Sequence, residues 1–512
     1  MGVSLQLKLS PIVGGDVTER DQRVRLLLFV PWLALVAWLL SGHVFWRDEV
    51  RAFSLALSGS NVIEMLRNVH GEGHPVLWYM ILRGAHDLFP YREVLPAAGA
   101  VLGIGAMALL AFWSPFRIAV IALVLFSLFG AFDYVVVARN YGISALVMFG
   151  LAALYGRVKD SLWLGVILAT LCNTNVPSCL LAAGFLLFRF VEMLTDGSKP
   201  ARRDWLIFAG NALLAAVGAM LCFITVYPTF NDAAVSSNAS DLSIANLFTA
   251  LLDAKRGFAH MGYGPLLLAI SCLGLIRRPA AICAAIAGLL ALKLFFYFVY
   301  PSYYRHEALF LVFLLSLYWM TAKGAGGTWL RKRPLDIVQL LGTFVFIGLL
   351  VLQSVLLISA IKLQNSGIPF SRSADVAELL RKPELSGAIV MGDPDTILEA
   401  LPYYVDNPLW FLRQQRFGNV VRLSENARRK LSLDDILADA ERLHRRTGRP
   451  VVFLSQLKIQ PGKEVRGVVM YDDETFGDRE AVNRFLSSTR LVASLRPSWG
   501  ASEDYDVYAY PR

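Results

Sequence analysis

LLLFVPWLALVAWLLSGHVFWRDE, residues 26–49, joins a long apolar run to an acidic pair. A membrane span needs about 20 mostly apolar residues, and this run with its flanks predicts one near residues 24–45. Three arginines precede the run, as in a signal peptide, but no small-residue cleavage site follows it, so we expect an uncleaved first span. Asp48 and Glu49 should then lie just beyond the membrane.

The composition extends this prediction to most of the chain. Of the 512 residues, 56% are hydrophobic and only 17% are charged, whereas soluble domains carry about 25% charged residues. Charge is concentrated in residues 362–512, which hold 22 Lys/Arg and 21 Asp/Glu. We therefore expect a transmembrane domain over residues 1–361 and a small soluble α/β domain, the tail, over residues 362–512.

The net charge of +9 does not indicate a nucleic-acid partner. The tail is nearly neutral, and the positive surplus lies in short loops between apolar runs, where it indicates membrane topology. All five cysteines fall inside apolar runs, which argues against a disulfide framework and against a clustered zinc site. We expect them to act as small buried hydrophobic side chains.

The apolar runs predict an α-helical polytopic membrane protein with about eleven spans. Their approximate ranges are 24–45, 94–113, 118–138, 141–156, 161–176, 177–194, 205–227, 261–276, 279–299, 308–322 and 337–361. A further segment, Pro75–Phe89, is apolar but has only fifteen residues, three of which are Arg83, His86 and Asp87. Whether it crosses the membrane determines the side on which every later loop lies.

Basic residues decide between the two topologies, because short cytoplasmic loops are enriched in Lys and Arg. If Pro75–Phe89 lies flat on the outer surface as an interfacial helix, the inner side receives 16 Lys/Arg and the outer loops receive nine. A crossing segment would reverse that bias. We therefore expect a cytoplasmic N-terminus and a periplasmic tail. Arg outnumbers Lys 37 to 12, as in GC-rich bacterial genomes, so we expect a bacterial inner membrane.

This topology gives two long outer loops, residues 46–92 and 229–260. The first loop contains apolar residues at helical spacing on both sides of a Gly-Ser break, which predicts two short helices. Asn61 and Glu64 form a pattern like a capping box at the start of the second helix. Short helices lying beside a bundle would form a cleft at the membrane surface.

The tail alternates short strands and helices. Residues 388–391, 451–454 and 491–495 are strand-like, and residues 433–446 show helical periodicity. Asp393-Pro394-Asp395 predicts a turn with a helix cap, which we favour over a metal or phosphate site.

Ionisable groups at the membrane edge are functional candidates because they are costly to hold there. Burial among aromatic residues would raise the pKa of the Asp48 carboxyl toward neutrality and make it a general base. Alternatively, Asp48 and Glu49 only complement the dipole at the start of a helix. The sequence leaves both interpretations open.

Two further clusters lie in outer segments. His70-Gly71-Glu72-Gly73-His74-Pro75 has two histidines four residues apart, but its glycines disfavour the helix that would aim both at a metal, so we favour a loop lining a polar pocket. Asp133 and Arg139, with Asn140 and Tyr141, lie around the end of the third span. Arg139 either binds a phosphate or extends to the headgroups without a ligand.

A last cluster surrounds the start of the tenth span. Lys293 lies about six residues, or roughly 9 Å, below the outer end of its span. Tyr304, Arg305 and His306 follow at the outer edge. Cations beside an aromatic belt suit a lipid phosphate, although such belts also occur without a ligand.

Three of these patterns together resemble a known family. They are the Asp-Glu pair that opens the first outer loop, the run Gly73-His74-Pro75-Val76-Leu77-Trp78-Tyr79, and the turn Ala138-Arg139-Asn140-Tyr141. Over about the first 310 residues the chain is similar to the GT-C glycosyltransferases, especially the bacterial protein O-mannosyltransferase and aminoarabinose transferase group. The tail does not resemble a family that we can name.

The resemblance implies transfer of one sugar from a polyprenyl-phosphate carrier to an acceptor hydroxyl on a lipid, a glycan or a protein. Asp48 would be the catalytic base, and membrane lipids would surround the protein. The expected substrate-binding residues are Glu49, His74, Asp133, Arg139, Asn140, Tyr141, Lys293, Tyr304, Arg305 and His306. No cofactor is required, although a divalent metal is compatible with the reaction.

One position departs from the family pattern. Relatives carry an acid just before the Ala-Arg-x-Tyr turn, where this chain has Val136-Val137. Asp133, one helical turn earlier, is the residue that would replace that acid.

Two other classes compete with a glycosyltransferase. A transporter also has many spans and charges within the membrane, but it does not require a structured first loop or an appended outer domain. An enzyme that transfers a phospho-headgroup would need a metal cage and a Ser or Thr nucleophile, and the sequence shows neither.

Overall fold

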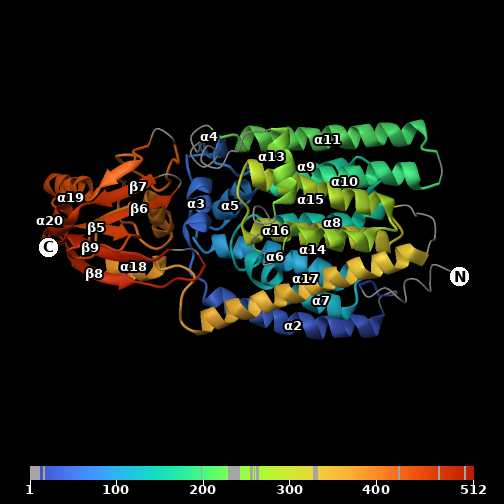
Figure 1. The fold of residues 1–512 in the computed structure, drawn as a ribbon, viewed down its shortest axis with the longest axis horizontal. Coiled ribbons are helices and arrows are strands. Elements are labelled where there is room, and N and C mark those ends of the chain that lie inside the picture. The colour runs from blue at the N-terminus through green and yellow to red at the C-terminus, as the bar shows by residue number, and fades with distance from the viewer. Residues whose placement is uncertain are drawn as a thin grey trace.

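The computed structural model describes residues 12–14, 18–197, 199–228, 243–253, 258, 260, 264–326, 333–424, 427–470, 473–500 and 503–512. These residues form a bundle of helices and, beyond one end of it, an α/β tail (Figure 1). The protein is therefore a helical polytopic membrane protein with a C-terminal mixed α/β domain, as predicted.

Seven described helices are long and apolar enough to cross a membrane. They are α2 (Glu19–Ser41), α6 (Val94–Trp113), α8 (Tyr141–Val158), α10 (Val176–Thr195), α11 (Arg202–Val226), α15 (Pro279–Phe298) and α17 (Arg333–Asn365). Thr18 caps the first of them by accepting a hydrogen bond from the Asp21 backbone N–H at 3.2 Å. Helix α17 continues to Asn365, so the expected boundary after residue 361 falls inside it.

The other four expected spans also coincide with helices, of which three are short or interrupted and the fourth is one continuous helix of 19 residues. They are α7 (Ile118–Leu125) with the π-helix η1 (Phe129–Asp133), α9 (Trp163–Cys172), α14 (Pro265–Cys272) with the 3-10 helix η2 (Leu273–Leu275), and α16 (Tyr304–Ala322). The third span breaks where Ser127 replaces regular backbone bonds, since its hydroxyl donates to the Val124 carbonyl and accepts from the Gly130 N–H. Hydropathy counts apolar residues and does not detect such a break.

The chain beyond η1 is irregular up to the start of α8, yet every residue from 129 to 141 is buried. Non-helical backbone at membrane depth is tolerated where protein surrounds it. Helices α6 and α8 approach this segment closely through Gly103 and Gly142, because a Cβ atom at either position would collide with the Tyr134 carbonyl oxygen. These two glycines therefore allow the third span to end in a loop inside the bundle.

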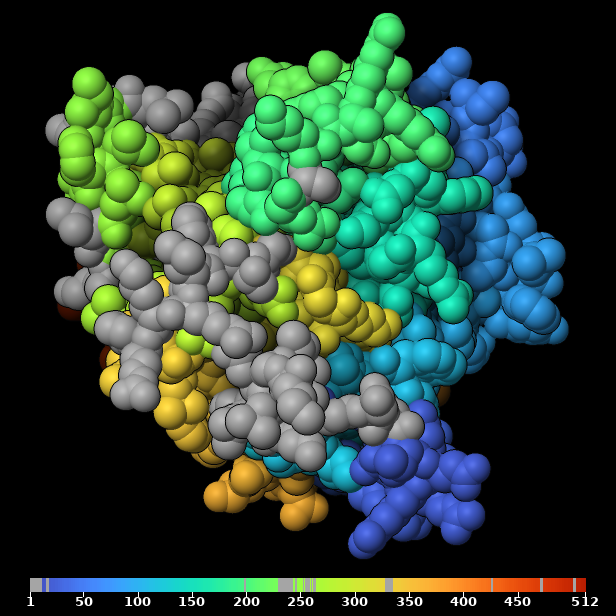
Figure 2. Space-filling view, turned by 90° about the vertical axis from the view of Figure 1, so that its right-hand side faces the viewer, coloured from blue at the N-terminus to red at the C-terminus, as the bar shows by residue number. Residues whose placement is uncertain are grey.

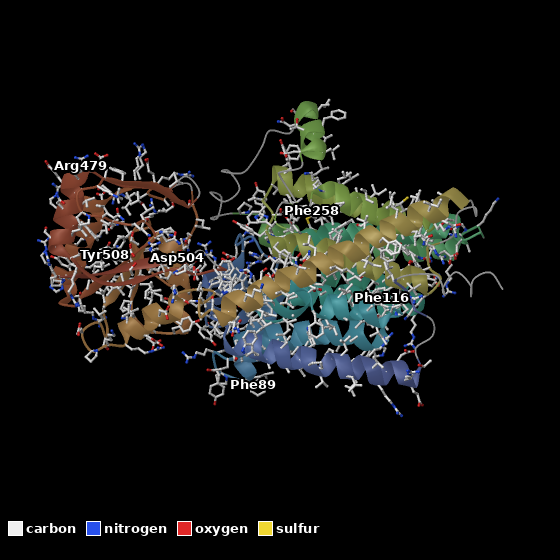
Figure 3. All side chains as sticks on the ribbon, turned by 60° about the horizontal axis from the view of Figure 1, so that its bottom comes forward. Phe89, Phe116, Phe258, Arg479, Asp504 and Tyr508 are labelled. Carbon is white, nitrogen blue, oxygen red and sulfur yellow. The ribbon has the colours of Figure 1, made fainter. Side chains whose placement is uncertain are left out.

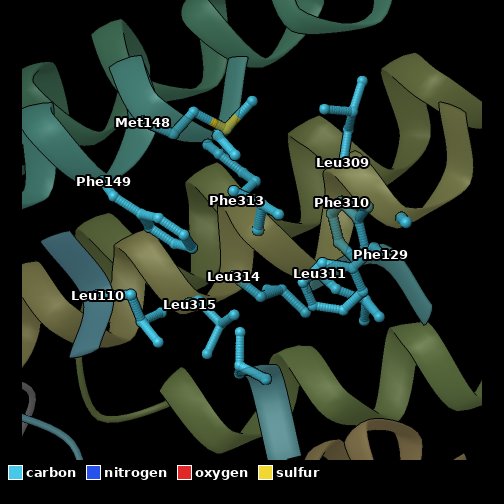
Figure 4. Close-up of a cluster of buried hydrophobic side chains, with 14 of the residues drawn as sticks. Leu110, Phe129, Met148, Phe149, Leu309, Phe310, Leu311, Phe313, Leu314 and Leu315 are labelled. Carbon is cyan, nitrogen blue, oxygen red and sulfur yellow. The ribbon is translucent and has the colours of Figure 1, made fainter. Parts of the chain in front are cut away.

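Helix α16 lies at the centre of the bundle. Residues 307–321 of this helix are all buried, and Figure 4 shows its leucines and phenylalanines packed against Met148 and Phe149 of α8 and against Phe129. Figure 2 looks at the end of the bundle opposite the tail. Segments from the N-terminal (blue) part of the chain to the later (orange) part lie together at this end.

The first long loop, residues 46–92, folds into three short helices, α3 (Arg47–Ala56), α4 (Val62–Val69) and α5 (Leu77–Leu88). Asn61 caps α4 as predicted, since its side chain accepts a hydrogen bond from the Glu64 N–H at 3.0 Å. The ambiguous segment Pro75–Phe89 forms α5, whose 12 residues are too few to cross a membrane. The second long loop contains α13 (Ile244–Leu252) within its described part.

The tail contains two sheets. The larger sheet has the order β3-β2-β1-β5-β9-β8, in which β1 pairs in parallel with β2 and β5 while β9 is antiparallel. Its strands are β1 (Ile389–Asp393), β2 (Leu409–Phe411), β3 (Arg416–Phe417), β5 (Val451–Ser455), β8 (Arg490–Leu495) and β9 (Tyr505–Tyr510). The smaller sheet has β4 (Lys430–Ser432), β7 (Asp473–Gly477) and β6 (Val465–Met470).

Four helical segments complete the tail: α18 (Ser373–Leu380), η3 (Asp395–Tyr403), α19 (Leu433–Thr447) and α20 (Arg479–Ser488). The strands and the helix that the sequence predicts are confirmed, but the predicted cap is not. Asp395 instead accepts the N–H groups of Leu412 and Arg413, which directly follow the neighbouring strand β2. In Figure 3, Arg479 marks the far end of the tail, while Asp504 lies nearer the bundle.

Candidate active site

Asp48 is the second residue of α3, at the end of the bundle that faces the tail. One Asp48 carboxylate oxygen lies 3.5 Å from an Arg139 guanidinium nitrogen, and the other lies 3.6 Å from Arg47. Arg139 also donates a hydrogen bond of 2.7 Å to the Asp48 carbonyl oxygen. The Asp48 side chain keeps 34% of its surface exposed, so the carboxylate is both fixed in place and accessible.

The expected rise in the pKa of Asp48 does not occur. Burial alone would raise the pKa of this carboxyl, but the positive charges of Arg139, Arg47 and Arg305 outweigh that effect and hold the pKa below its ordinary value. The aromatic neighbours of Asp48 are evident in the sequence, but the convergence of these arginines depends on the fold. Asp48 is therefore an ionised carboxylate at neutral pH.

Glu49, the neighbouring acid, is fully buried and faces the protein interior. Its carboxylate accepts the backbone N–H of Ala138 at 2.6 Å and that of Trp46 at 3.3 Å, and it lies 2.9 Å from the His43 ring nitrogen Nε2. These bonds join the start of α3 to the turn that carries Arg139. Glu49 thus positions the two sides of the site, in contrast to the substrate-binding role expected from the sequence.

His74 reaches the same cluster from the loop between α4 and α5. Its Nε2 lies 3.0 Å from an Arg139 nitrogen, so it accepts that N–H and its own proton resides on Nδ1. Burial, together with the Arg139 charge, lowers the pKa of His74 to about 4. His74 is therefore a neutral donor at physiological pH.

The start of α16 supplies the remaining groups. Arg305 lies over the Trp46 ring with its Cζ 4.8 Å from the ring centre. Within the part of the chain that the structure describes, its guanidinium donates no hydrogen bond and forms no salt bridge. His306 accepts the Tyr303 N–H on Nδ1 at 3.0 Å and bonds the Tyr141 hydroxyl through Nε2 at 2.8 Å. Tyr141 also lies within electrostatic range of Arg139, which completes the cluster.

Six of the eleven sequence-predicted residues therefore converge. The converging set is Asp48, His74, Arg139, Tyr141, Arg305 and His306. Asp133 lies behind them, 8% exposed and within electrostatic range of Arg305 and His43. No described residue donates a hydrogen bond to the Asp133 carboxylate.

The last three predicted residues point elsewhere, which corrects their assignment to the site. Asn140 donates to the Thr174 carbonyl at 2.6 Å, Lys293 donates to the Asp253 carbonyl, and Tyr304 donates to Gln353 on α17. Each is satisfied by a contact on its own side of the bundle. Sequence position alone does not show the direction of a side chain.

The sequence analysis missed a buried ionic cluster beside the site. Arg51 on α3 forms two hydrogen bonds of 2.6 Å to Glu72 and also pairs with Glu399 of the tail. Arg51 lies one helical turn after Asp48, so the sequence indicates that the two share a face of the helix. Its partner Glu399 lies almost 350 residues away, and a single sequence does not reveal such a contact. Tyr79, buried within electrostatic range of Arg139, Glu72 and Asp48, was also missed although it lies in a quoted motif.

Residues 70–75 lie between α4 and α5. In the described ranges, no three His, Cys, Asp or Glu side chains are grouped as metal ligands. Glu72 is directed to Arg51 and His74 to Arg139. The segment is a loop with positive φ at Gly71 and Gly73, as the glycines indicate.

Comparisons with known proteins identify the fold. No family model and no curated protein matches the chain. The solved structure of ArnT from Cupriavidus metallidurans in the apo state matches with a TM-score of 0.50 and 16% sequence identity, over 94% of this chain and 97% of that one. The same protein bound to undecaprenyl phosphate gives a TM-score of 0.49 at 15% identity and equal coverage.

The chain thus shares the overall fold of a solved polytopic membrane protein. The particular fold is the ArnT fold, with a helical membrane domain followed by a C-terminal α/β domain. The likeness extends into the tail, which the sequence resemblance did not cover. At this level of identity it concerns the fold and leaves the reaction to be argued from the site.

Proposed function

We propose that this protein transfers a sugar from a polyprenyl-phosphate carrier to an acceptor hydroxyl. The convergence of Asp48 with Arg139 and Arg305, from three separate elements, carries this proposal. The site places one ionised, accessible carboxylate among cations at the end of the bundle nearest the tail. The fold supports it, because the GT-C architecture is found in enzymes of this class.

The cations suit the leaving group. Arg305 has its guanidinium uncommitted within the described residues, and Arg139 presents a planar fork of donors that fits phosphate oxygens. His74 adds a neutral N–H on Nδ1. Together they would hold a phosphodiester as it departs as an anion, and fixed donors aimed at developing charge are worth several kcal/mol in such sites.

Asp48 would act on the other partner. The acceptor hydroxyl attacks C1 of the sugar, the bond from C1 to the phosphate oxygen breaks, and the hydroxyl proton passes to the Asp48 carboxylate. The products are a glycosylated acceptor and polyprenyl phosphate. No strong general acid is needed, because the leaving group is already stable as an anion.

The identity of the sugar and of the acceptor lies outside this argument, because a fold fixes neither. A lipid, a glycan or a protein at the outer face of a bacterial inner membrane fits the proposed topology. The reaction does not depend on a bound metal, since Arg139 and Arg305 supply the positive charge. A divalent ion is nevertheless compatible with it, and adding EDTA to the assay tests for one.

Replacing Asp48 tests the proposal. We expect Asp48→Asn to lower the transfer rate from a radiolabelled polyprenyl-phosphate sugar to membrane acceptors by about 10²- to 10⁴-fold, the range of a general base. Donor binding and membrane insertion should be retained. Asp87→Asn is the matched control, because Asp87 lies in the same loop but is exposed and, among the described residues, pairs with Arg83 alone.

Full transfer by Asp48→Asn would dismiss the assigned base. Wild-type protein that moves a labelled solute across proteoliposomes but leaves every acceptor unmodified would instead favour the transporter. Mass spectrometry of envelope glycolipids and glycoproteins from cells with and without the gene would then identify the acceptor.

A further inference from the structure

Tyr79, the third residue of α5, is a buried tyrosine near Asp48 and Arg139 that the proposed mechanism does not use. The residue is only 2% exposed. Its ring packs in an apolar cluster that contains Ala52 of α3 and Ala138 of the turn before α8. Ala52 lies one helical turn after Asp48, and Ala138 directly precedes Arg139. The ring is therefore held between the two elements that carry the carboxylate and the cation of the site.

The Tyr79 hydroxyl has no hydrogen-bond partner within the described part of the chain. It is also not one of the polar atoms that are fully enclosed without a partner. The oxygen therefore reaches accessible space, although the ring behind it is buried. Polar groups of buried side chains ordinarily have a partner, so an open, unpartnered hydroxyl at this position is suited to a ligand.

The two carboxylates near this hydroxyl already have cations of their own. Glu72 accepts two hydrogen bonds of 2.6 Å from Arg51, and Asp48 lies 3.5 Å from Arg139. Burial, together with the Glu72 charge, raises the pKa of the Tyr79 phenol above its ordinary value. The hydroxyl therefore keeps its proton and is available as a donor.

The groups around the hydroxyl suit an anionic oxygen. Arg139 lies within electrostatic range of Tyr79, and a guanidinium presents a planar fork of donors that fits phosphate oxygens. His74, which accepts an Arg139 N–H, has its own N–H on the other side of the ring. A phosphate that reaches these donors would also meet the Tyr79 hydroxyl.

We propose that the Tyr79 hydroxyl donates a hydrogen bond to a phosphate oxygen of the polyprenyl-phosphate donor and so helps to hold the leaving group. The proposal rests on the proposed function and adds a residue that contacts the substrate. A neutral donor strengthens the grip on phosphate without placing another charge beside Asp48. Tyr79→Phe isolates this contact, because phenylalanine keeps the ring and removes only the oxygen.

The preference for a phosphate tests the proposal without turnover. Full-length protein in detergent micelles is titrated with farnesyl phosphate and, in parallel, with farnesol, which lacks the phosphate. We expect the wild type to bind farnesyl phosphate more tightly than farnesol. Tyr79→Phe should lose about tenfold of that preference, the effect of one hydrogen bond to a charged group.

Tyr318→Phe is the matched control. Tyr318 is buried on α16, and its hydroxyl also lacks a partner among the described residues, but that hydroxyl is fully enclosed. It lies roughly 20 Å along the helix from Tyr304, where α16 begins beside the site. Tyr318→Phe should keep the preference of the wild type.

Thermal unfolding separates a substrate contact from a structural one. Because the Tyr79 hydroxyl bonds no described group, Tyr79→Phe should leave the midpoint of unfolding unchanged. A clearly lower midpoint would show a structural bond and overturn the proposal. A preference for farnesyl phosphate equal to that of the wild type would overturn it as well and leave the hydroxyl to water.

The transfer assay identifies the substrate that the hydroxyl contacts. We expect Tyr79→Phe to lower kcat/KM for the donor and to leave KM for the acceptor unchanged, and a loss confined to the acceptor KM would overturn the proposal. These outcomes are distinct from failure of the proposed function. A wild type without any preference for phosphate would remove both proposals, whereas full transfer by Asp48→Asn would dismiss the base and leave the phosphate contact of Tyr79 intact.

Discussion

Asp48 and Glu49 are neighbours in sequence with opposite environments. Successive residues of a helix point about 100° apart, so Asp48 faces the arginines while Glu49 faces the interior. The sequence identified the pair as functional but could not distinguish its members. The difference depends on Ala138 and Arg139, which only the folded chain brings alongside.

The low pKa of Asp48 makes a prediction about pH. A base works when it is deprotonated, so a lowered pKa moves the acidic limb of the rate profile to lower pH. Because Arg139 is the largest of the cations that lower this pKa, we expect Arg139→Gln to shift the acidic limb upward, in addition to reducing the overall rate. The check is the pH dependence of kcat/KM in wild type and variant. A limb at the same pH in both would contradict the proposed coupling.

Glu49 predicts an effect on stability. Glu49→Gln weakens the bonds to Ala138, Trp46 and His43, and hydrogen bonds to a charged group are worth about 1.5–3 kcal/mol. We expect a lower midpoint of thermal unfolding in nanodiscs. Glu384→Gln, which alters an exposed pair with Arg490, should leave the midpoint unchanged. An unaltered midpoint in Glu49→Gln would show that these bonds contribute little.

At the scale of elements, the tail holds the helix that carries Asp48. Glu503 accepts the Arg47 backbone N–H at 3.1 Å, which satisfies one of the free donors at the start of α3. The Tyr404 hydroxyl accepts the Phe45 N–H at 2.8 Å, and Glu399 pairs with Arg51. Trp46, the residue before α3, has no side chain that caps the helix, and Glu503 of the tail takes that role.

Two of these carboxyls make the contact sensitive to pH. Burial raises the pKa of Glu399 and of Glu503 to about 7, above the ordinary value of 4.5. A raised pKa stabilises the docked tail fully below the ordinary pKa, and this contribution is lost as the pH rises through about 7. We expect the backbone amides of residues 45–51 to exchange hydrogen faster at about pH 8 than at about pH 6, after correction for intrinsic rates.

Glu503→Gln should reduce that pH dependence, because glutamine does not titrate. Glu474→Gln is the control, because Glu474 lies in β7 of the smaller sheet. Identical protection at both pH values in the wild type would exclude a role for these carboxyls in docking.

The elements were predictable to different degrees. Long apolar helices such as α2 and α6 follow from residue counts, and the capping pattern of Asn61 located α4. The break after Leu125 was not predictable, because an apolar π-helix and an apolar α-helix have the same hydropathy. The site was also predictable only in part. The sequence indicates which residue types are candidates, but it does not indicate side-chain directions such as those of Lys293 and Tyr304.

For the whole molecule, the remaining prediction concerns orientation. Charge bias predicts that the tail and the site lie outside and that the start of α11, at Arg203, lies inside. In a chain whose five cysteines are replaced, we expect Arg479→Cys to react with an impermeant maleimide in spheroplasts and Arg203→Cys to react only after permeabilisation. Both positions are exposed. The reverse pattern would put the site in the cytoplasm and contradict the proposed reaction.

Because of Gly103 and Gly142, the protein should be sensitive to mutation at positions that no substrate could contact. An added methyl group at either glycine would push the Tyr134 carbonyl and, with it, the turn that bears Arg139. In a library of random mutants, changes that abolish the proposed activity should therefore also appear deep within the apolar helices. An alanine at either glycine should lower that activity as much as the loss of an arginine does.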